Sequence, residues 1–411
     1  MYRKVLAVSA VVVLAACQDS PSPIEPTEPK GDLSVDQAQV VEELPQVPEN
    51  AVEGQVVPDQ YVVVLKNTVS DVTVNARRLA REHGARLGYV YGAALKGFSA
   101  RMPAAVAARL ARDPMVEYIE PDRVVTTQTT QFGAPWGLDR IDQVNLPLNG
   151  LFNYLRSGTG VRIYIIDTGM RISHQQFRNL AGASRAAYSW DFVDNDPVAQ
   201  DCNGHGTHVA GTAAGRTYGV AKNAYLRAVR VLNCAGSGTF SQVIAGVNWV
   251  TANAIKPAVA NMSLGGGLYA PLNLAVMNSI ASGVTYAVAA GNSSGNACSY
   301  SPSSVGTALS VMASASNDTR AGFSNFGACA DLYAPGVSIV SAWWTSDVAT
   351  AVLNGTSMAS PHVAGVAAQY LQTTPLGTPA MVTAQILGMA SIGKIIGNPA
   401  GTPNRLLRTW L

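Results

Sequence analysis

Charged residues are scarce in this sequence: they make up 13% of its 411 residues, against about 25% in an average globular protein. The 28 basic and 26 acidic residues nearly cancel, which leaves a net charge of +2. Binding of nucleic acid needs a clustered basic surface, so this composition argues against a nucleic-acid partner. The chain is too long for one ordinary domain, and 48% of its residues are hydrophobic, so we expect one large and one small domain.

Cysteine is scarce too. The five cysteines include no CxxC pair, which argues against a zinc site. Cys17 stands alone near the N-terminus, and the other four lie in the C-terminal two-thirds of the chain. Four cysteines in an exported protein suggest two disulfide bonds, and their spacing leaves three pairings open.

Long hydrophobic runs are missing as well, and no segment would span a bilayer as a mature helix. The short apolar run Val5–Ala16 follows Arg3 and Lys4, which is typical of an export signal. Its end, Leu14-Ala15-Ala16-Cys17, resembles a bacterial lipobox, in which the cysteine is lipidated. We therefore predict a signal peptide over residues 1–17 and lipidation of Cys17. An ordinary signal peptide with an incidental cysteine is the alternative.

Two further segments precede the main domain. Residues 18–57 are predicted to be a disordered, extended linker, because they are rich in proline and acids and almost free of aromatic residues. Residues 58–128 combine short apolar strands with two helices, a pattern typical of a small α+β domain. Its expected elements are strand 61–65, helix 74–83, strand 95–102, helix 104–112 and strand 115–119.

The rest of the chain alternates strands with helices. Nearly continuous apolar runs indicate strands that are buried on both faces. This pattern predicts a parallel sheet flanked by helices, with the active site beyond the carboxyl ends of the strands. The predicted strands are 161–166, 228–232, 259–264, 284–290 and 309–313, and the predicted helices include 241–253, 272–282 and 363–371.

Polar motifs lie at the ends of these elements. Asp167 directly follows a buried strand, His205 lies between two glycines, and Ser357 precedes an apolar helix. A serine is a poor nucleophile unless an imidazole accepts its proton, and the imidazole needs an acid to fix its tautomer. A fourth motif places Asn292 after another buried strand, where its amide could donate to a developing oxyanion. Together these residues predict nucleophilic catalysis by a serine.

The four motifs resemble those of the subtilisin-like serine proteases, most closely the aqualysin-type members of the proteinase K branch. The chain order of acid, histidine and serine is also the subtilisin order. The resemblance covers nearly everything from residue 134 to 411, and includes Pro135–Ile141, Asn261–Gly267 and Pro403–Leu407. It implies a subtilisin-like peptidase domain over residues 129–411, with a parallel sheet flanked by helices.

The resemblance implies a role for each matching residue. Asp167 orients His205, which acts first as general base and then as general acid. Ser357 attacks the peptide carbonyl and forms an acyl-enzyme, and Asn292 contributes to the oxyanion hole. Small residues around the first pocket suggest broad cleavage after large apolar or aromatic residues. Met312 stands where this branch often has glycine, in a strand expected near that pocket. The implied substrate-binding residues are Gly236, Ser237, Gly238, Ser263, Leu264, Gly265, Ala289 and Gly291.

Disulfide bonds and calcium are implied in the same way. The pairs would be Cys202–Cys234 and Cys298–Cys329. Structural calcium would be held by Asp331 and the backbone carbonyls of Gly306 and Ala308, because hard cations prefer oxygen ligands. The acidic loop Asp194-Asn195-Asp196…Asp201 is a weaker candidate for a second calcium ion. No catalytic cofactor is expected.

By the same resemblance, the small domain (58–128) is an inhibitory propeptide with ferredoxin-like topology. Its tail, Val125–Gln128, would occupy the active site after cleavage near Gln128–Thr129. The chain is thus expected to be a secreted bacterial precursor that processes itself and acts as a monomer on proteins and peptides. Its own propeptide would serve as inhibitor and folding aid. An anchor on Cys17 would hold only the precursor at the membrane.

Three alternatives fit the sequence less well. An inactive relative that binds peptides would lack a member of the triad, and none is missing. A serine esterase of the α/β-hydrolase type has the motif Gly-x-Ser-x-Gly, whereas Ala359 stands two residues after Ser357. A purely structural lipoprotein would need none of the four motifs.

Overall fold

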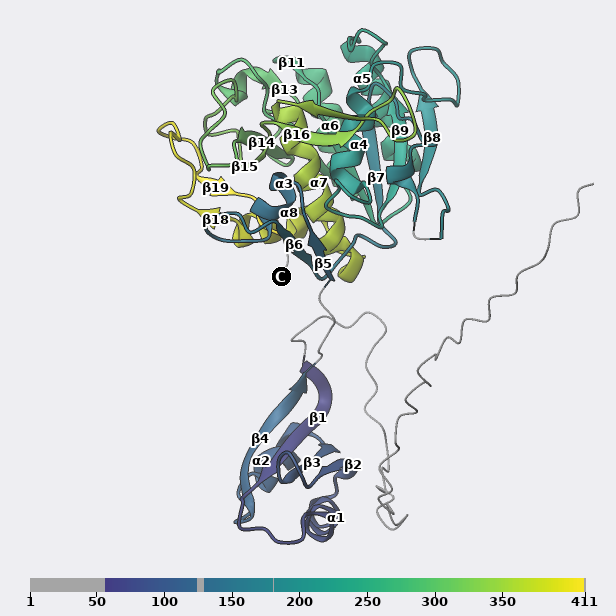
Figure 1. Ribbon diagram of the computed structural model, residues 1–411. Helices are drawn as coiled ribbons and strands as arrows, with labels where there is room; N and C mark the ends of the chain where they lie inside the picture. The colour runs from purple at the N-terminus through teal and green to yellow at the C-terminus, as the bar shows by residue number, and fades with distance from the viewer. Residues whose placement is uncertain (1–55, 124–128, 180, 410–411) are drawn as a thin grey trace, which may run out of the picture. The chain divides into compact units, whose positions relative to one another are not determined.

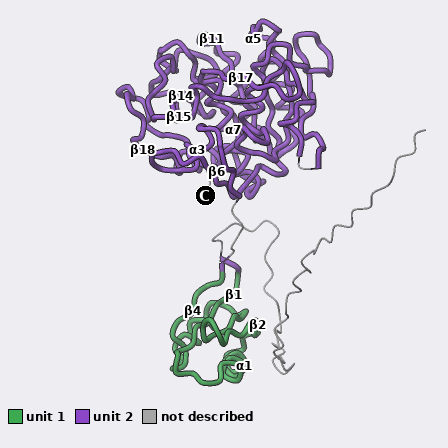
Figure 2. The backbone as a smooth tube through the Cα atoms, in the orientation of Figure 1, with its two compact units in different colours: residues 1–46, 58–122 green, residues 47–57, 123–411 purple. Residues whose placement is uncertain are grey.

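The computed structural model describes residues 56–123, 129–179 and 181–409. Two compact units divide the chain close to Asp122 and Arg123 (Figure 2). The predicted signal peptide with Cys17, nearly all of the predicted linker, and the segment 124–128 before the predicted cleavage site lie outside the described residues. The predicted domain boundaries at residues 57 and 128 therefore stay predictions.

The smaller unit is an antiparallel sheet packed on two helices. Phe98, Leu79 and Leu110 are fully buried between the layers. The strand order β2-β3-β1-β4 is that of the expected ferredoxin-like fold. Its elements are β1 (Val56–Leu65), α1 (Val72–His83), β2 (Arg86–Tyr91), β3 (Gly97–Arg101), α2 (Ala104–Leu110) and β4 (Val116–Arg123).

Strand β2 of this unit is absent from the prediction. Its pairing with β3 shifts register between Leu87 and Val90, so the irregularity interrupts the alternation of apolar and polar residues. Helix α1 is bounded by the signals that sequence provides. The Asp71 side chain accepts a hydrogen bond from the backbone N–H of Val74, and Gly84 ends the helix in a left-handed conformation.

The larger unit contains a nine-stranded sheet (Figure 1). Every pairing from β8 across to β19 is parallel, and β18 pairs antiparallel with β19 at one edge. In spatial order the strands are β18 (Ser391–Ile392), β19 (Arg405–Leu406), β15 (Leu332–Pro335), β14 (Leu309–Ser314), β12 (Thr285–Ala289), β10 (Ala258–Met262), β7 (Arg162–Asp167), β9 (Tyr225–Arg230) and β8 (Ala186–Asp191).

Helices cover both faces of this sheet. Successive side chains of a strand point to opposite faces, and β7 shows the division. Ile163 and Ile165 share a hydrophobic cluster with helices α4 (His205–Ala214), α7 (Thr356–Thr373) and α8 (Pro379–Met389). Tyr164 and Ile166 share a second cluster with α5 (Phe240–Asn253) and α6 (Ala270–Ala281). Burial on both faces explains the continuous apolar runs, and the predicted α/β architecture is confirmed.

Short elements complete the larger unit. They include α3 (Trp136–Ile141) and the antiparallel pairs β5 (Thr129–Phe132) with β6 (Leu151–Tyr154), β11 (Gly266–Gly267) with β13 (Tyr300–Ser301), and β16 (Ile339–Ala342) with β17 (Thr350–Leu353).

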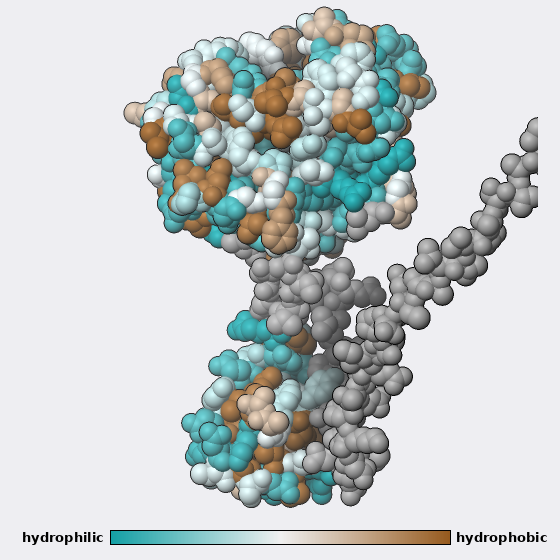
Figure 3. Space-filling model, in the orientation of Figure 1, coloured by the Kyte–Doolittle hydropathy of each residue, from teal (hydrophilic) through white to brown (hydrophobic). Residues whose placement is uncertain are grey.

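None of the described helices is long and apolar enough to cross a membrane. On the face of the larger unit that is in view, hydrophobic residues form small separate groups rather than one continuous patch (Figure 3).

Candidate active site

The polar residues singled out in the sequence lie at the ends of elements in the larger unit. Asp167 is the last residue of β7, His205 is the first of α4, and Ser357 is the second of α7. Helix α7 begins at Thr356, earlier than its apolar segment indicates, so Ser357 lies within the first helical turn. The first four N–H groups of a helix have no partner within it, which favours negative charge at this end.

Asp167 and His205 form a direct pair. The Nδ1 of His205 lies 2.7 Å from Oδ1 of Asp167. The acid side chain is 0% exposed and the imidazole 26% exposed. The backbone N–H of Thr168 donates to the same Oδ1 at 2.7 Å, and Oδ2 has no hydrogen-bond partner among the described residues. One carboxylate oxygen is therefore held both by the backbone just after its strand and by the imidazole.

The electrostatics of His205 favour its charged form. Burial lowers the pKa of the imidazole, but the charge and hydrogen bond of Asp167, together with the charge of Asp201, outweigh it. The pKa of His205 is therefore raised above its ordinary value of 6.5. Two carboxylates thus stabilise a proton on this ring.

Gly204 lets the segment that carries Trp343 and Trp344 pack closely against the backbone before His205. Its φ of 111° lies in the left-handed region that favours glycine. A Cβ at this position would lie 2.5 Å from ring atoms of both Trp343 and Trp344. Any side chain here would have to displace two indole rings, which explains why a glycine precedes the histidine.

Ser357 takes part in a reciprocal pair with Ser263. Its hydroxyl donates to the Ser263 carbonyl at 3.1 Å, and the Ser263 hydroxyl donates to the Ser357 carbonyl at 2.7 Å. Beneath this pair, the amide of Asn261 donates to Ser263 Oγ at 2.9 Å, and the hydroxyl of Ser360 donates to Asn261 Oδ1 at 2.7 Å. This buried chain ties α7 to the end of β10. Asn261 belongs to the matching segment Asn261–Gly267, but neither it nor Ser360 was given a role from the sequence.

Asn292 has a defined orientation. Its Oδ1 accepts from the backbone N–H and from the hydroxyl of Thr356, both at 2.9 Å. Because the oxygen is engaged on that side, Nδ2 points the other way. Asn292 and Ser357 line the same cavity.

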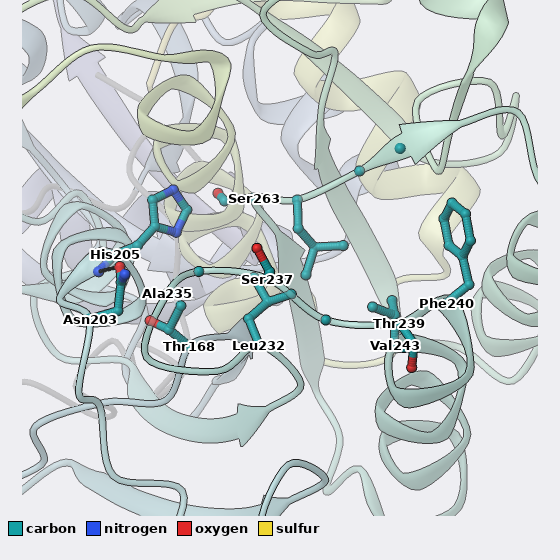
Figure 4. Close-up of a pocket in the computed structure, with 15 residues that line it drawn as sticks. Thr168, Asn203, His205, Leu232, Ala235, Ser237, Thr239, Phe240, Val243 and Ser263 are labelled. Carbon is teal, nitrogen blue, oxygen red and sulfur yellow. Dashed lines mark hydrogen bonds between the residues drawn. The ribbon is translucent and has the colours of Figure 1, made fainter.

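Two cavities adjoin the polar residues. The first, of about 600 Å³, has His205 near one end and Phe240 near the other (Figure 4). The second, of about 350 Å³, contains Ser357 and Asn292. All eight residues expected to bind substrate line one or both cavities: Gly236, Ser237, Gly238, Ser263, Leu264 and Gly265 the first, and Leu264, Gly265, Ala289 and Gly291 the second. Met312 lines neither, since it is fully buried in a cluster with Tyr333 and Leu406.

The structure contains two disulfide bonds. They join Cys202 to Cys234 and Cys298 to Cys329, which are the pairs that the resemblance implies. The first bridge lies directly beside the loop that leads into His205. The guanidinium of Arg230 lies against both of its sulfur atoms, at 3.4 and 3.7 Å.

The acidic loop does not gather its carboxylates around one point. Asp194 pairs with Arg230 at 2.7 Å, and Asp196 accepts from the backbone N–H of Val198. Asp201 turns inward and accepts only from N–H and O–H groups. Within residues 56–123, 129–179 and 181–409, no three His, Cys, Asp or Glu side chains come together as a metal cluster. The weaker calcium candidate at this loop was therefore wrong for Asp201.

Asp331, the other calcium candidate, directly precedes β15. Its Oδ2 accepts from the backbone N–H of Ser310 at 2.8 Å. Burial raises the pKa of this carboxyl to about 6, although that hydrogen bond and the charge of Arg405 oppose the shift. A carboxylate in this position would be stabilised by a nearby cation.

The remaining histidines of the larger unit are structural. His174, His208 and His362 are all buried, and each bonds a backbone carbonyl through a ring nitrogen. Burial lowers the pKa of His208 and of His362 to about 4. Both rings are therefore neutral at ordinary pH, and each donates its single N–H to a backbone carbonyl.

The fold and the arrangement of these residues define the class of subtilisin-like serine proteases. The Subtilase family model matches residues 158–406, and the Peptidase inhibitor I9 model matches residues 60–128. The chain belongs to the subtilase family and is a serine endopeptidase with an I9 propeptide.

Several known proteins are similar over most of the chain. It is 47% identical over 375 residues to an extracellular serine proteinase of Thermus sp. (strain Rt41A), covering 86% of this chain and 90% of that protein. It is 48% identical over 336 residues to the alkaline serine exoprotease A of Vibrio alginolyticus, covering 80% of this chain and 61% of that protein. The crystal structure of a cold adapted subtilisin-like serine proteinase matches with a TM-score of 0.65 and 51% identity, covering 68% of this chain and 99% of that one.

Proposed function

We propose that the chain is the precursor of a secreted serine endopeptidase of broad specificity, with Asp167, His205 and Ser357 as its catalytic triad. The observation that carries this proposal is the 2.7 Å pair between the buried Asp167 and the imidazole of His205. It is supported by the position of Ser357, which lies in the first turn of α7 and lines the cavity next to the one that His205 lines.

The geometry supports a role for each residue. The bond to Asp167 leaves a proton on Nδ1 of His205, so Nε2 is the basic nitrogen that faces the reaction. The hydroxyl of Ser357 turns from the Ser263 carbonyl to Nε2, gives up its proton and attacks the peptide carbonyl. The imidazolium then returns this proton to the leaving amine, and water releases the acyl group by the same steps in reverse.

The oxyanion is stabilised from two sides. The side chain of Asn292 is oriented by Thr356, so its Nδ2 donates without having to reorganise. The backbone N–H of Ser357, within the first turn of α7, is the second donor. Both donors belong to groups whose other hydrogen bonds already fix their direction.

Substrate binds as an extended strand between two backbone edges. The edges are Gly236–Gly238 and Ser263–Gly265, which line the same cavity. Main-chain hydrogen bonds to such edges give affinity that depends little on sequence, which supports broad specificity. The second cavity, of about 350 Å³ and lined by small residues such as Ala289 and Gly291, has room for a large apolar or aromatic side chain before the cleaved bond.

Self-processing and export complete the proposal. Cleavage near Gln128–Thr129 would release the catalytic domain from the propeptide, and the I9 match up to residue 128 supports this position. The extracellular relative from Thermus supports secretion. If Cys17 is lipidated, the anchor belongs to the precursor, and cleavage frees the mature monomer. Membrane fractions that retain anchored mature enzyme would contradict this step.

Structural calcium is proposed at Asp331 with the carbonyls of Gly306 and Ala308. The buried carboxylate with its raised pKa fits a hard cation. The ion would add stability to the loop before β14 and would take no part in the chemistry.

One experiment tests the central proposal. The purified protein is treated with a serine-directed fluorophosphonate and the labelled peptide is mapped. We expect one label, on Ser357, and loss of peptidase activity in proportion to labelling. The variant Ser357→Ala should resist the label and accumulate as unprocessed precursor by intact mass. Labelling at another serine, or processing of purified Ser357→Ala, would overturn the assignment.

A further inference from the structure

Asp201 is a buried acid that hydrogen-bonds neutral groups. It is 1% exposed, and both of its oxygens are engaged. Oδ1 accepts from the Thr168 hydroxyl at 3.0 Å and from the backbone N–H groups of Asn203 and Gly204 at 2.9 and 2.8 Å. Oδ2 accepts from the backbone N–H of Thr207 at 2.9 Å and from its hydroxyl at 2.6 Å. Five hydrogen bonds from neutral donors therefore fix the position of this carboxylate.

These donors come from both sides of the catalytic pair. Thr168 directly follows Asp167 at the end of β7, and its hydroxyl accepts from the backbone N–H of Gly206 at 2.9 Å. The other donors surround His205 in the chain. One carboxylate therefore joins the strand end that carries the acid to the helix start that carries the imidazole.

The charge of Asp201 also acts on the ring. Three titratable groups face His205: Asp167 on β7, Asp201 on the preceding loop and His208 one turn along α4. The two acids favour a proton on the ring, and the charge of His205 contributes to lowering the pKa of His208. Asp201 makes no hydrogen bond to the imidazole among those described, so its influence on the ring is exerted through space.

We propose that Asp201 is a positioning residue of the catalytic machinery, which sets the backbone of His205 relative to Asp167 and whose negative charge stabilises the imidazolium formed during catalysis. This inference rests on the proposed function. It assigns a use to an acid that the sequence pattern placed among calcium candidates. Asp201 acts through the backbone and at a distance, so the loss of its charge should slow the chemical step more than it weakens substrate binding.

The first test is the variant Asp201→Asn, measured with Asp196→Asn as a matched control. Asp196 lies in the same acidic loop and also accepts one backbone hydrogen bond, but among the described residues neither a hydrogen bond nor its charge links it to His205. Asparagine keeps the shape of Asp201 but turns an N–H₂ group toward donors. We expect kcat to fall about 100-fold, as small misplacements of catalytic groups cause, with KM nearly unchanged. The control should match the parent protein in both constants.

The pH profile separates this role from a merely structural one. Removing the charge of Asp201 lowers the pKa of His205, so the acid limb of kcat/KM should move to lower pH in Asp201→Asn and stay in place in Asp196→Asn. Fluorophosphonate titration counts the folded, competent sites, so kcat is expressed per active site. An unchanged kcat per site, or an unmoved acid limb, would overturn the inference.

Two milder variants test the proposal even if Asp201→Asn does not fold. Thr207→Val removes one hydroxyl donor to Asp201 at nearly constant volume, whereas Thr207→Ser keeps it. We expect Thr207→Val to lower kcat and Thr207→Ser to restore it; equal kcat in both variants would contradict the proposal. If the parent protein is not labelled at Ser357, the proposed function itself has failed. If the parent is labelled and active while Asp201→Asn equals it, only the present inference has failed.

Discussion

Removing the two disulfide bonds one at a time should have equal effects on stability and different effects on catalysis. The bridges Cys202–Cys234 and Cys298–Cys329 close loops of 32 and 31 residues. The chain-entropy relation then gives a stabilisation of about 4 kcal/mol for each at 25 °C. We therefore expect the double serine variants of the two bridges to lose nearly the same free energy of unfolding.

Catalysis should distinguish the bridges because of where they attach. Cys202 lies between Asp201 and Asn203, so its bridge supports the loop that leads into His205. Its loss should lower kcat. Cys298 is two residues from Tyr300, which lines the cavity beside Ser357. Its loss should raise KM for substrates with a large side chain before the cleaved bond, with a smaller effect on kcat.

Stability is measured by urea unfolding in a Ser357→Ala background, where self-digestion is excluded. All six tryptophans lie at or after residue 136, so their fluorescence reports only on the larger unit and not on the propeptide. If removal of each bridge lowers the free energy of unfolding by well below about 2 kcal/mol, the entropic reasoning is refuted. Equal losses of kcat would refute the assignment of the first bridge to the His205 loop.

The remaining predictions concern single groups. Because the pKa of His205 is raised and the base must be neutral, the acid limb of kcat/KM should have its midpoint above 6.5; a midpoint below this value contradicts the two-carboxylate environment. Asn292→Leu should lower kcat about 100- to 1,000-fold with little change in KM, which is the loss found for such a donor in another subtilisin. Calcium chelation should lower the melting temperature of the parent protein but not of Asp331→Asn; equal shifts would remove Asp331 from the site. Burial lowers the pKa of Lys222 from 10.5 to about 7, so between these values the unfolded chain holds a proton that the folded chain has lost, and stability rises with pH. The stability of the parent minus that of Lys222→Met should thus grow by up to about 5 kcal/mol from pH 7 to 10.5, and a flat difference would show that the amine stays charged in the fold.

The elements that the sequence predicted well are those whose burial is uniform. Strand β7 and helix α5 lie close to their expected positions because one is buried on both faces and the other begins with a capping box at Thr239. Strand β8 was not predicted. It lies at the edge of the sheet beside β9, is half-buried along most of its length and shifts register after Tyr188, so it shows neither a continuous apolar run nor a clean alternation. Edge strands of this kind are stabilised by their neighbour rather than by their own pattern.

The acidic loop shows why carboxylates are hard to interpret from spacing. Four oxygen-bearing residues close together satisfy the chemistry of a calcium site. In the fold, backbone N–H groups and hydroxyls donate hydrogen bonds to Asp201, and Arg230 forms an ion pair with Asp194. Those donors come from segments as distant as Thr168, and nothing in the local sequence identifies them. The choice between a metal ligand and a hydrogen-bond acceptor is therefore made by tertiary structure.

The polar residues of the site meet because their elements share one hydrophobic core. Ile165 of β7 and Val209 of α4 belong to the same buried cluster as the apolar face of α7. Each element carries its polar residue at the end where that cluster stops: Asp167 ends β7, His205 begins α4 and Ser357 lies in the first turn of α7. Packing sets the separations between the three, and local hydrogen bonds then set their directions. Since close-packed cores resist small displacements, the site can be preorganised without any contact between the three motifs in sequence.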